Sequence, residues 1–313
     1  MGKKTLTSFV REVASELSEE GRYGTSHVYR STANSLIKFL GMRSLCLDGV
    51  TPRLLKAYED WLRGQKRSWD TVGTYMHTLQ AAYNRAVDRG LAPYVPRLFK
   101  GVFTGRASQR KGALEVNQVR CLLAEDSSDE LPYRLEHSRA CLELMLRFQG
   151  MPFVDLAHLQ KSDLKDGYLV LRRMKTGHPL SILVDERAAE LLQRYAPADP
   201  SSPYLLDIMP GNLSGKAKFT AYQSCLRQFN EQLKQLAVYR RVTDRVTSYS
   251  MRHTWATQSK YCGIPVSVIS EGLGHDSVKT TEVYLSRYGE SFLDKANKIT
   301  LDYIFNGIKR PWL

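Results

Sequence analysis

Three residues in the last quarter of this 313-residue chain have side chains suited to phosphoryl chemistry: Arg252, His275 and Tyr284. A guanidinium presents a planar fork of donors that fits the non-bridging oxygens of a phosphate. An imidazole can donate to the same phosphate or transfer a proton. A phenol can act as a nucleophile when nearby cations favour loss of its proton. Taken singly, these are a surface arginine, a helix-end histidine and an ordinary tyrosine, so the interpretation depends on their spacing.

The sequence around these residues closely resembles the phage-integrase family of tyrosine recombinases. The family's second catalytic box reads HxxRHxxAT, followed by LGH and then by TTxxY. This chain has Arg252-His253-Thr254-Trp255-Ala256-Thr257, then Leu273-Gly274-His275, then Thr280-Thr281-Glu282-Val283-Tyr284. The resemblance implies attack of Tyr284 on a scissile phosphate, a 3′-phosphotyrosyl enzyme and a free 5′-hydroxyl. Because the bond energy is retained, it implies neither a metal nor any other cofactor.

The resemblance also points to a lysine as a candidate catalytic residue. Lys175 lies in Arg173-Met174-Lys175-Thr176-Gly177, at the turn of a predicted hairpin. The family places its catalytic lysine in such a hairpin, which implies that Lys175 is the general acid for the leaving 5′-oxygen. A turn lysine that only increases solubility is the alternative.

The chain departs from the family pattern at the first histidine of HxxR, where it has Tyr249. If this segment is helical, Tyr249 lies three residues before Arg252 on the same face, and its hydroxyl could donate to phosphate. It cannot become cationic. A tyrosine packed in the core is the alternative reading.

A larger departure affects the family's first box, TGLRxxEL, because Pro152 stands where its catalytic arginine is usual. We expect Arg173 to supply the missing guanidinium, since strand side chains alternate and would place Arg173 and Lys175 on one face. Arg147 is the second candidate and Arg139 the third. Both departures resemble a branch of integrases from mobile elements of Bacteroides-type bacteria.

The elements that must position these residues fall into two predicted domains. Apolar residues recur at helical spacing over 5–20, 26–40, 52–64 and 69–88, which predicts a small all-helical domain over residues 1–90. Residues 113–313 are expected to be helical except for two strands within 167–184. The fold class is therefore mainly α with a small β-sheet. The resemblance implies a SAM-like core-binding domain and an integrase-type catalytic domain that form a C-shaped clamp around DNA.

Charge points to a polyanionic partner, with nucleic acid ahead of an anionic membrane. The formal net charge is +13, and residues 1–112 hold 19 Lys and Arg against 9 Asp and Glu. We predict a basic interdomain linker over 91–112, which contains five basic residues and no acidic one. The residues expected to contact DNA are Lys66, Arg67, Arg106, Arg110 and Lys111. A merely solvated connector is the alternative.

Five scattered cysteines without a CxxC pair indicate neither a disulfide framework nor a zinc site. The absence of a signal peptide or an apolar span favours a cytoplasmic protein without membrane contact. The resemblance implies double-stranded DNA recombination sites and three further copies of the chain as partners. Accessory DNA-bending proteins are further candidate partners, and the location would be the bacterial nucleoid.

Two questions stay open at this point. The apolar tail beyond Arg287 could dock on a neighbouring subunit or pack in cis; its members are Phe292, Leu293, Ile299, Leu301, Tyr303, Ile304 and Phe305. The second question is the function, where the departures at Pro152 and Tyr249 motivate one rival and the shared tyrosine chemistry suggests another. One is a catalytically impaired DNA-binding regulator of a mobile element, and the other is a type IB topoisomerase.

Overall fold

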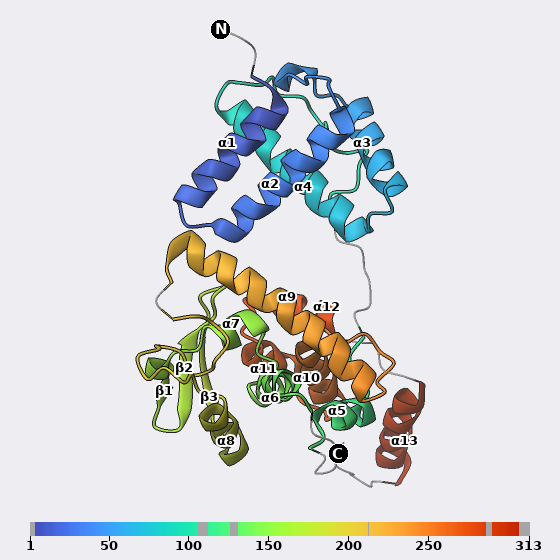
Figure 1. Ribbon diagram of the computed structural model, residues 1–313. Coiled ribbons are helices and arrows are strands. Elements are labelled where there is room, and N and C mark those ends of the chain that lie inside the picture. The colour runs from blue at the N-terminus through green and yellow to red at the C-terminus, as the bar shows by residue number, and fades with distance from the viewer. Residues whose placement is uncertain (1–3, 106–111, 126–130, 212, 286–289, 307–313) are drawn as a thin grey trace. The chain divides into compact units, whose positions relative to one another are not determined.

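The computed structural model describes residues 4–105, 112–125, 131–211, 213–285 and 290–306 (Figure 1). The chain divides into two compact units. The N-terminal unit comprises Met1–Gln109 and Ser214–Phe219, and the C-terminal unit comprises Arg110–Leu213 and Thr220–Leu313. Each unit has a hydrophobic core of its own.

Four α-helices lie wholly within the N-terminal unit, which also contains the first residues of α9 (Gly215–Tyr239): α1 (Leu6–Glu19), α2 (Tyr23–Leu40), α3 (Pro52–Gly64) and α4 (Trp69–Asp88). These bounds confirm the four predicted helices. Three of them start at a hydroxyl N-cap whose oxygen accepts a backbone N–H; the caps are Thr5, Thr51 and Ser68. The apolar stripes of the four helices face inward and form one core.

The first part of the predicted linker packs onto this unit. Leu98, Phe99 and Val102 are buried in the same core as the four helices. The basic composition of 91–112 hides this short apolar pattern, so a solvated connector over the whole segment is not what the structure shows.

The chain next runs tightly against α3 and α4. The backbone N–H of Phe103 donates to the buried carboxylate of Glu59 at 2.6 Å. A Cβ on Gly73 would lie 2.0 Å from the carbonyl oxygen of Gly105, so only a glycine fits at position 73. The N-terminal unit is therefore packed as far as residue 105.

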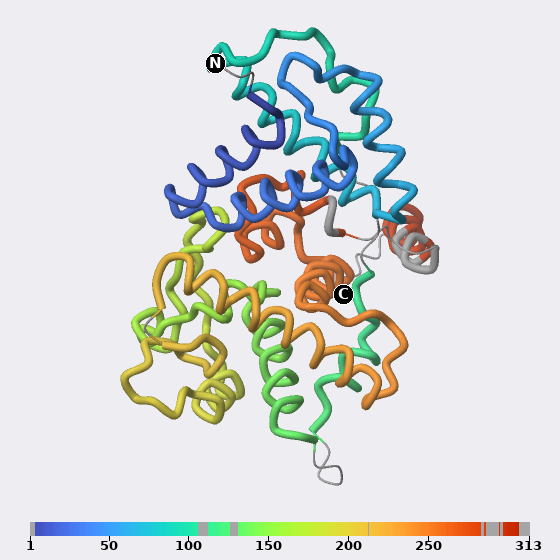
Figure 2. The backbone as a smooth tube through the Cα atoms, turned by 45° about the horizontal axis from the view of Figure 1, so that its top comes forward, coloured from blue at the N-terminus to red at the C-terminus, as the bar shows by residue number. Residues whose placement is uncertain are grey.

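The C-terminal unit is mainly helical, and Figure 2 shows the path of its backbone. Its helices are α5 (Val116–Leu123), α6 (Tyr133–Arg147), α7 (Phe153–Ala157), α8 (Glu186–Arg194), α9 (Gly215–Tyr239), α10 (Ser250–Tyr261), α11 (Val266–Gly272), α12 (Val278–Tyr284) and α13 (Glu290–Asn306). Its one described sheet is antiparallel in the order β1 (Leu164–Lys165), β2 (Tyr168–Arg172) and β3 (Pro179–Leu183). The predicted hairpin is thus present, with β1 as an additional short strand. Short 3₁₀ turns occupy Leu47–Gly49 and Lys161–Asp163.

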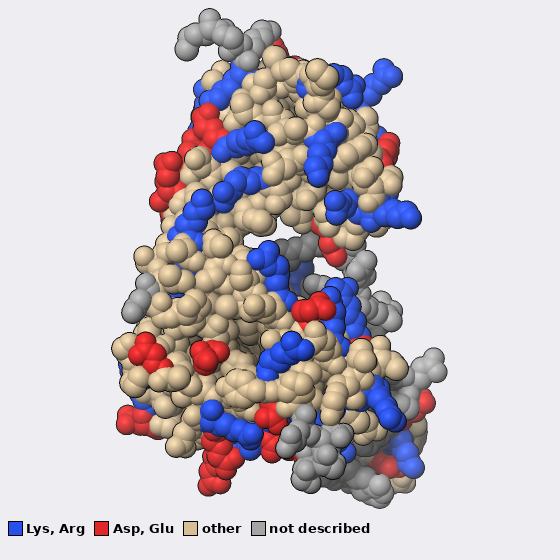
Figure 3. Space-filling model, in the orientation of Figure 1, with Lys and Arg blue, Asp and Glu red and all other residues tan. Residues whose placement is uncertain are grey.

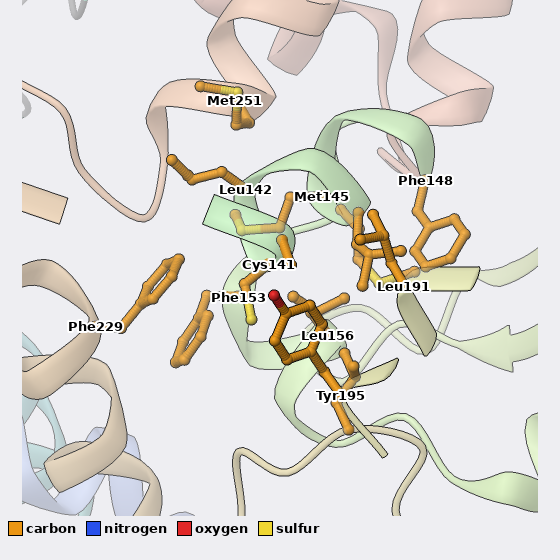
Figure 4. Packing of buried hydrophobic residues seen from close by; sticks show 14 of the residues in the cluster. Cys141, Leu142, Met145, Phe148, Phe153, Leu156, Leu191, Tyr195, Phe229 and Met251 are labelled. Atoms are coloured by element: carbon orange, nitrogen blue, oxygen red, sulfur yellow. The ribbon is translucent and has the colours of Figure 1, made fainter. Parts of the chain in front are cut away.

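The core of this unit surrounds α6, whose central residues are fully buried (Figure 4). Phe153 at the start of α7 stacks on Phe229 of α9 with ring centroids 4.2 Å apart. Met251, in the first turn of α10, is buried in the same cluster. Burial of Met251 fixes the start of α10 against α6 and thereby positions the next residue, Arg252.

Over the described ranges, no helix is both long and apolar enough to cross a lipid bilayer.

Candidate active site

Arg252 is buried at the start of α10 and holds two other segments. It is 2% exposed. Its Nη1 donates to the carbonyl of Gly150 at 3.0 Å, and its Nη2 donates to the carbonyl of Leu273 at 2.6 Å. The same Nη2 lies 3.0 Å from Nε2 of His275. One guanidinium therefore joins the turn before α7 to the connection between α11 and α12.

Arg173 reaches the same place from the hairpin. It is 6% exposed, and its Nη1 also donates to the carbonyl of Leu273. Its Nε lies 2.5 Å from Oδ2 of Asp155, whose other oxygen accepts the backbone N–H of Met174 at 2.9 Å. The structure thus brings Arg173 and Arg252 together.

Strand alternation is nevertheless the wrong reason for this placement. Strand β2 ends at Arg172, so Arg173 and Lys175 lie in the loop and the alternation of a strand does not apply to them. Arg173 is buried by its ion pair with Asp155, whereas Lys175 is exposed in the turn. Lys175 still acts electrostatically on the site, where its charge is among the causes that lower the pKa of His275.

Two glycines allow the backbone to approach the arginines. Gly150 has φ of +69°, and a Cβ there would lie 3.0 Å from the Cα of Arg252. Gly274 has φ of +62°, and a Cβ there would lie 3.0 Å from Cγ of Arg173. Both positions need a left-handed backbone without a side chain.

His275 lies between the arginines and α12. Its Nδ1 is 2.8 Å from the hydroxyl of Thr281, a fully buried residue. Burial lowers the pKa of His275 to about 4, and the charges of Arg252 and Arg173 act in the same direction. The ring is therefore neutral at physiological pH.

Tyr284 is the last residue of α12, three residues after Thr281. The Tyr284 side chain and the whole of Tyr288 lie outside the described residues. The backbone of the proposed nucleophile therefore lies on the helix whose Thr281 hydrogen-bonds to His275.

Tyr249 is 40% exposed, so the alternative of a core tyrosine is wrong. It is the N-cap of α10 with αR backbone, and its carbonyl accepts the backbone N–H of His253 at 3.2 Å, so Tyr249 continues the helical geometry three residues before Arg252. Tyr222 on α9 is a further tyrosine that the motifs did not indicate. Burial raises its pKa, and the charges of Tyr249 and Asp155 add to the effect. No pattern in the sequence separates Tyr222 from other aromatic residues of α9.

The other two candidate arginines belong to a different network. Arg147 pairs with Glu143 at 2.9 Å and with Asp185 at 2.7 Å. Arg139 pairs with Glu125 at 2.6 Å and with Glu143 at 3.3 Å. These carboxylates join α6 to its neighbours, and the structure does not bring either arginine to Arg252.

The predicted DNA contacts are described only in part. Lys66 and Arg67 are exposed in the turn between α3 and α4. Lys and Arg side chains are spread over the face of the N-terminal unit seen in Figure 3. Arg106, Arg110 and Lys111 lie outside the described residues.

Comparison with known proteins matches both parts of the chain to one family. Residues 5–99 match the phage integrase SAM-like domain, and residues 113–290 match the phage integrase family. This chain belongs to the phage integrase family.

Curated relatives are tyrosine recombinases. The chain is 24% identical to tyrosine recombinase XerC of Thermodesulfovibrio yellowstonii, with 89% of this chain and 90% of the relative covered. It is 24% identical to tyrosine recombinase XerA of Pyrococcus furiosus, with 91% of both chains covered. XerD of Agrobacterium fabrum is also 24% identical, over 89% of this chain and 88% of the relative. These relatives give no support to the alternative of an impaired regulator.

Solved structures show the same fold. The integrase of transposon Tn1549 in complex with a circular intermediate DNA superposes with a TM-score of 0.65 at 15% identity, covering 94% of this chain and 99% of that chain. A lambda integrase tetramer bound to a Holliday junction has a TM-score of 0.65 at 18% identity, covering 92% of this chain and 80% of that chain.

Proposed function

We propose that this tyrosine-type site-specific recombinase cleaves and rejoins DNA strands through a 3′-phosphotyrosyl bond to Tyr284. The convergence of Arg173 and Arg252 on the Leu273 carbonyl, beside His275, supports this assignment most strongly. Two fixed guanidiniums supply the positive charge that a phosphorane-like transition state needs. The departure at Pro152 is then compensated by Arg173, which fills the role of the missing arginine.

The proposed reaction conserves the number of phosphoester bonds. The Tyr284 oxygen forms a bond to phosphorus while the bond from phosphorus to the 5′-oxygen breaks, and the leaving oxygen takes a proton from Lys175. The 5′-hydroxyl of a partner strand reverses these steps. Tyr249, which is 40% exposed at the N-cap of α10, is a further donor to phosphate in this proposal.

The proposal assigns residues 1–90 as the core-binding domain, 91–112 as the interdomain segment and 113–313 as the catalytic domain. Lys66, Arg67, Arg106, Arg110 and Lys111 contact the DNA backbone. Because the substrate is chromosomal or mobile-element DNA, we place the protein at the bacterial nucleoid. Accessory DNA-bending proteins are candidate additional partners of this assembly.

We also propose that four copies assemble on two recombination sites, as the lambda integrase neighbour does on a Holliday junction. The described end of α13 supports docking on a second copy over packing in cis. Four of its apolar side chains are exposed, by 42% to 77%; they are Leu301, Tyr303, Ile304 and Phe305. Large apolar side chains grouped at one helix end favour a protein interface.

The test uses a binding site selected with this protein from random duplex DNA and then nicked close to the scissile position. A nick just downstream of the scissile phosphate lets the short fragment that carries the freed 5′-hydroxyl dissociate, so a covalent adduct accumulates. We expect the wild type to form adduct and Tyr284→Phe to form none while retaining its Kd. Adduct with the Phe variant would move the nucleophile to another residue, with Tyr288 next. Absence of adduct with the wild type would favour the regulator, and relaxation of supercoils without strand exchange would indicate a topoisomerase.

A further inference from the structure

The hydrogen bonds of His275 determine which of its ring nitrogens carries the proton. Nε2 lies 3.0 Å from Nη2 of Arg252, and Nδ1 lies 2.8 Å from the hydroxyl oxygen of Thr281. A guanidinium has only donor hydrogens, so Nε2 must be the acceptor in the first contact. A neutral imidazole then carries its single proton on Nδ1, and Thr281 accepts it.

We propose that Thr281 is a positioning residue that keeps His275 in the Nδ1–H tautomer, so that Nε2 stays a hydrogen-bond acceptor for Arg252 and helps to hold its guanidinium in place. This inference rests on the proposed function and deepens it. In this tautomer Nε2 carries no proton to donate, so His275 acts on the site through its hydrogen bond with Arg252.

The same contact joins the acceptor to the helix of the nucleophile. Thr281 and Tyr284 lie three residues apart in α12, and Thr281 is fully buried. If α12 moved away from His275, the hydrogen bond to Thr281 would break and the ring proton would no longer be held on Nδ1. The Nδ1–H tautomer of His275 therefore depends on the position of α12.

Charged groups around His275 keep the ring neutral. The position of its single proton, on Nδ1 or on Nε2, is then the property that Thr281 can change. Arg252 approaches from α10, Arg173 and Lys175 from the hairpin loop, and Asp276 follows His275 directly. Burial and the three cations lower the pKa of His275 to about 4, against the opposing effect of Asp276. The proposal therefore applies over the whole range from about pH 5.5 to 8.

Two neighbouring threonines provide a matched pair of variants. Thr281→Val replaces the hydroxyl by a methyl group of similar size and removes the acceptor. Thr281→Ser keeps the hydroxyl and should restore the wild-type behaviour. Thr280→Val makes the same chemical change at an exposed position one residue earlier.

The deciding measurement is ¹⁵N NMR of the full chain labelled at histidine, without DNA. The ring nitrogens have distinct shifts with and without a proton, and His275→Gln assigns the signals among the seven histidines. We expect a protonated Nδ1 in the wild type, in Thr281→Ser and in Thr280→Val. In Thr281→Val the proton should redistribute toward Nε2. An Nε2–H tautomer in the wild type, or an unchanged Nδ1–H in a folded Thr281→Val, overturns the proposal.

Adduct formation on the nicked selected site gives the second readout. Leaving a buried donor without an acceptor corresponds to a loss of about 10- to 100-fold in rate. We expect that loss for Thr281→Val at unchanged Kd, with Thr281→Ser and Thr280→Val near the wild type. A wild type that forms no adduct would count against the proposed function alone, because the NMR result still decides the role of Thr281.

Discussion

Arg173 and Arg252 donate to one and the same acceptor, the carbonyl oxygen of Leu273. Two guanidiniums held this close repel each other, and both are buried. The carboxylate of Asp155 offsets part of that repulsion through its ion pair with Arg173. A site that gathers buried positive charge in this way is prepared for an anionic ligand.

The first prediction concerns Arg173. Arg173→Ala should lower the rate of adduct formation by about 100- to 1000-fold, since a charge-stabilising donor is removed from the transition state. Arg173→Lys should restore only part of the rate, because an ammonium lacks the planar fork. Single-turnover cleavage and Kd on the nicked selected site measure both effects.

Arg172→Ala is the matched control, since Arg172 is the adjacent exposed arginine and donates to the carbonyl of Gly177. It should cleave like the wild type. Arg147→Ala should lower Tm without a comparable loss of cleavage, because Arg147 pairs with Glu143 and Asp185. A larger loss of rate for Arg147→Ala than for Arg173→Ala would reverse the assignment.

A second prediction tests the close approach at Gly150. Gly150→Ala places an alanine in a left-handed backbone conformation and brings its Cβ within 3.0 Å of the Cα of Arg252. Gly167 also has a positive φ, of +78°, but a Cβ there meets nothing within 4 Å. Gly167→Ala should therefore cost only the conformational strain of about 1–2 kcal/mol. Gly150→Ala should lower Tm further and also slow cleavage, and equal effects of the two variants would contradict this account.

The pKa of His275 gives a third prediction, on stability. Its folded pKa of about 4 lies below the unfolded value near 6.5. Above pH 6.5 the ring is neutral in both states and has no pH effect. Between pH 6.5 and 4 the unfolded chain binds a proton that the folded chain excludes, so this contribution to stability is lost as pH falls. Because the ring is partly exposed, we expect a loss of about 1–2 kcal/mol rather than the full conversion.

Calorimetry of the wild type and of His275→Gln at pH 7 and pH 4.5 checks this slope. Asp and Glu residues titrate in both proteins, so only the difference between the two slopes reports on His275. The variant should lose less stability than the wild type over this interval. Parallel slopes would mean that the folded pKa is not lowered.

The fourth prediction concerns the basic segment. Neutralising Arg106, Arg110 and Lys111 together should weaken binding to all sequences alike. The slope of log K against log salt should flatten by about 0.9 for each phosphate that the variant no longer neutralises. The control neutralises three exposed basic residues of the C-terminal unit with the same change in net charge: Arg120, Arg194 and Lys234. If both triple variants change the slope equally, net charge rather than direct phosphate binding explains the effect.

Local sequence patterns predicted the helices of the N-terminal unit because each carries its own signal. The apolar stripe, the hydroxyl cap and the closing glycine all lie within a few residues of the helix they define. The packing of residues 98–105 depends on Glu59 and Gly73, which are far away in sequence. A local sequence pattern cannot predict such a contact between distant parts of the chain.

The candidate site shows the same division. The motifs identified Arg252, His275 and Tyr284, because residue type and spacing are visible in the chain. Strand alternation suggested Arg173, although the interaction that buries it is the ion pair with Asp155. Thr281 stood inside the motif, and its hydrogen bond to His275 appears only in three dimensions.

The packing of the chain up to Gly105 limits how far the two units can separate. From Gly105 to Gly112 the chain has seven residue steps, and seven residues span at most roughly 25 Å when fully extended. Once one unit has bound DNA, the other is confined to a small volume around the same site. Its effective concentration there is in the millimolar range, typical of short linkers. Two individually weak contacts with DNA can thus give a long-lived complex, and inserting residues between Gly105 and Gly112 would shorten its residence time without altering either binding surface.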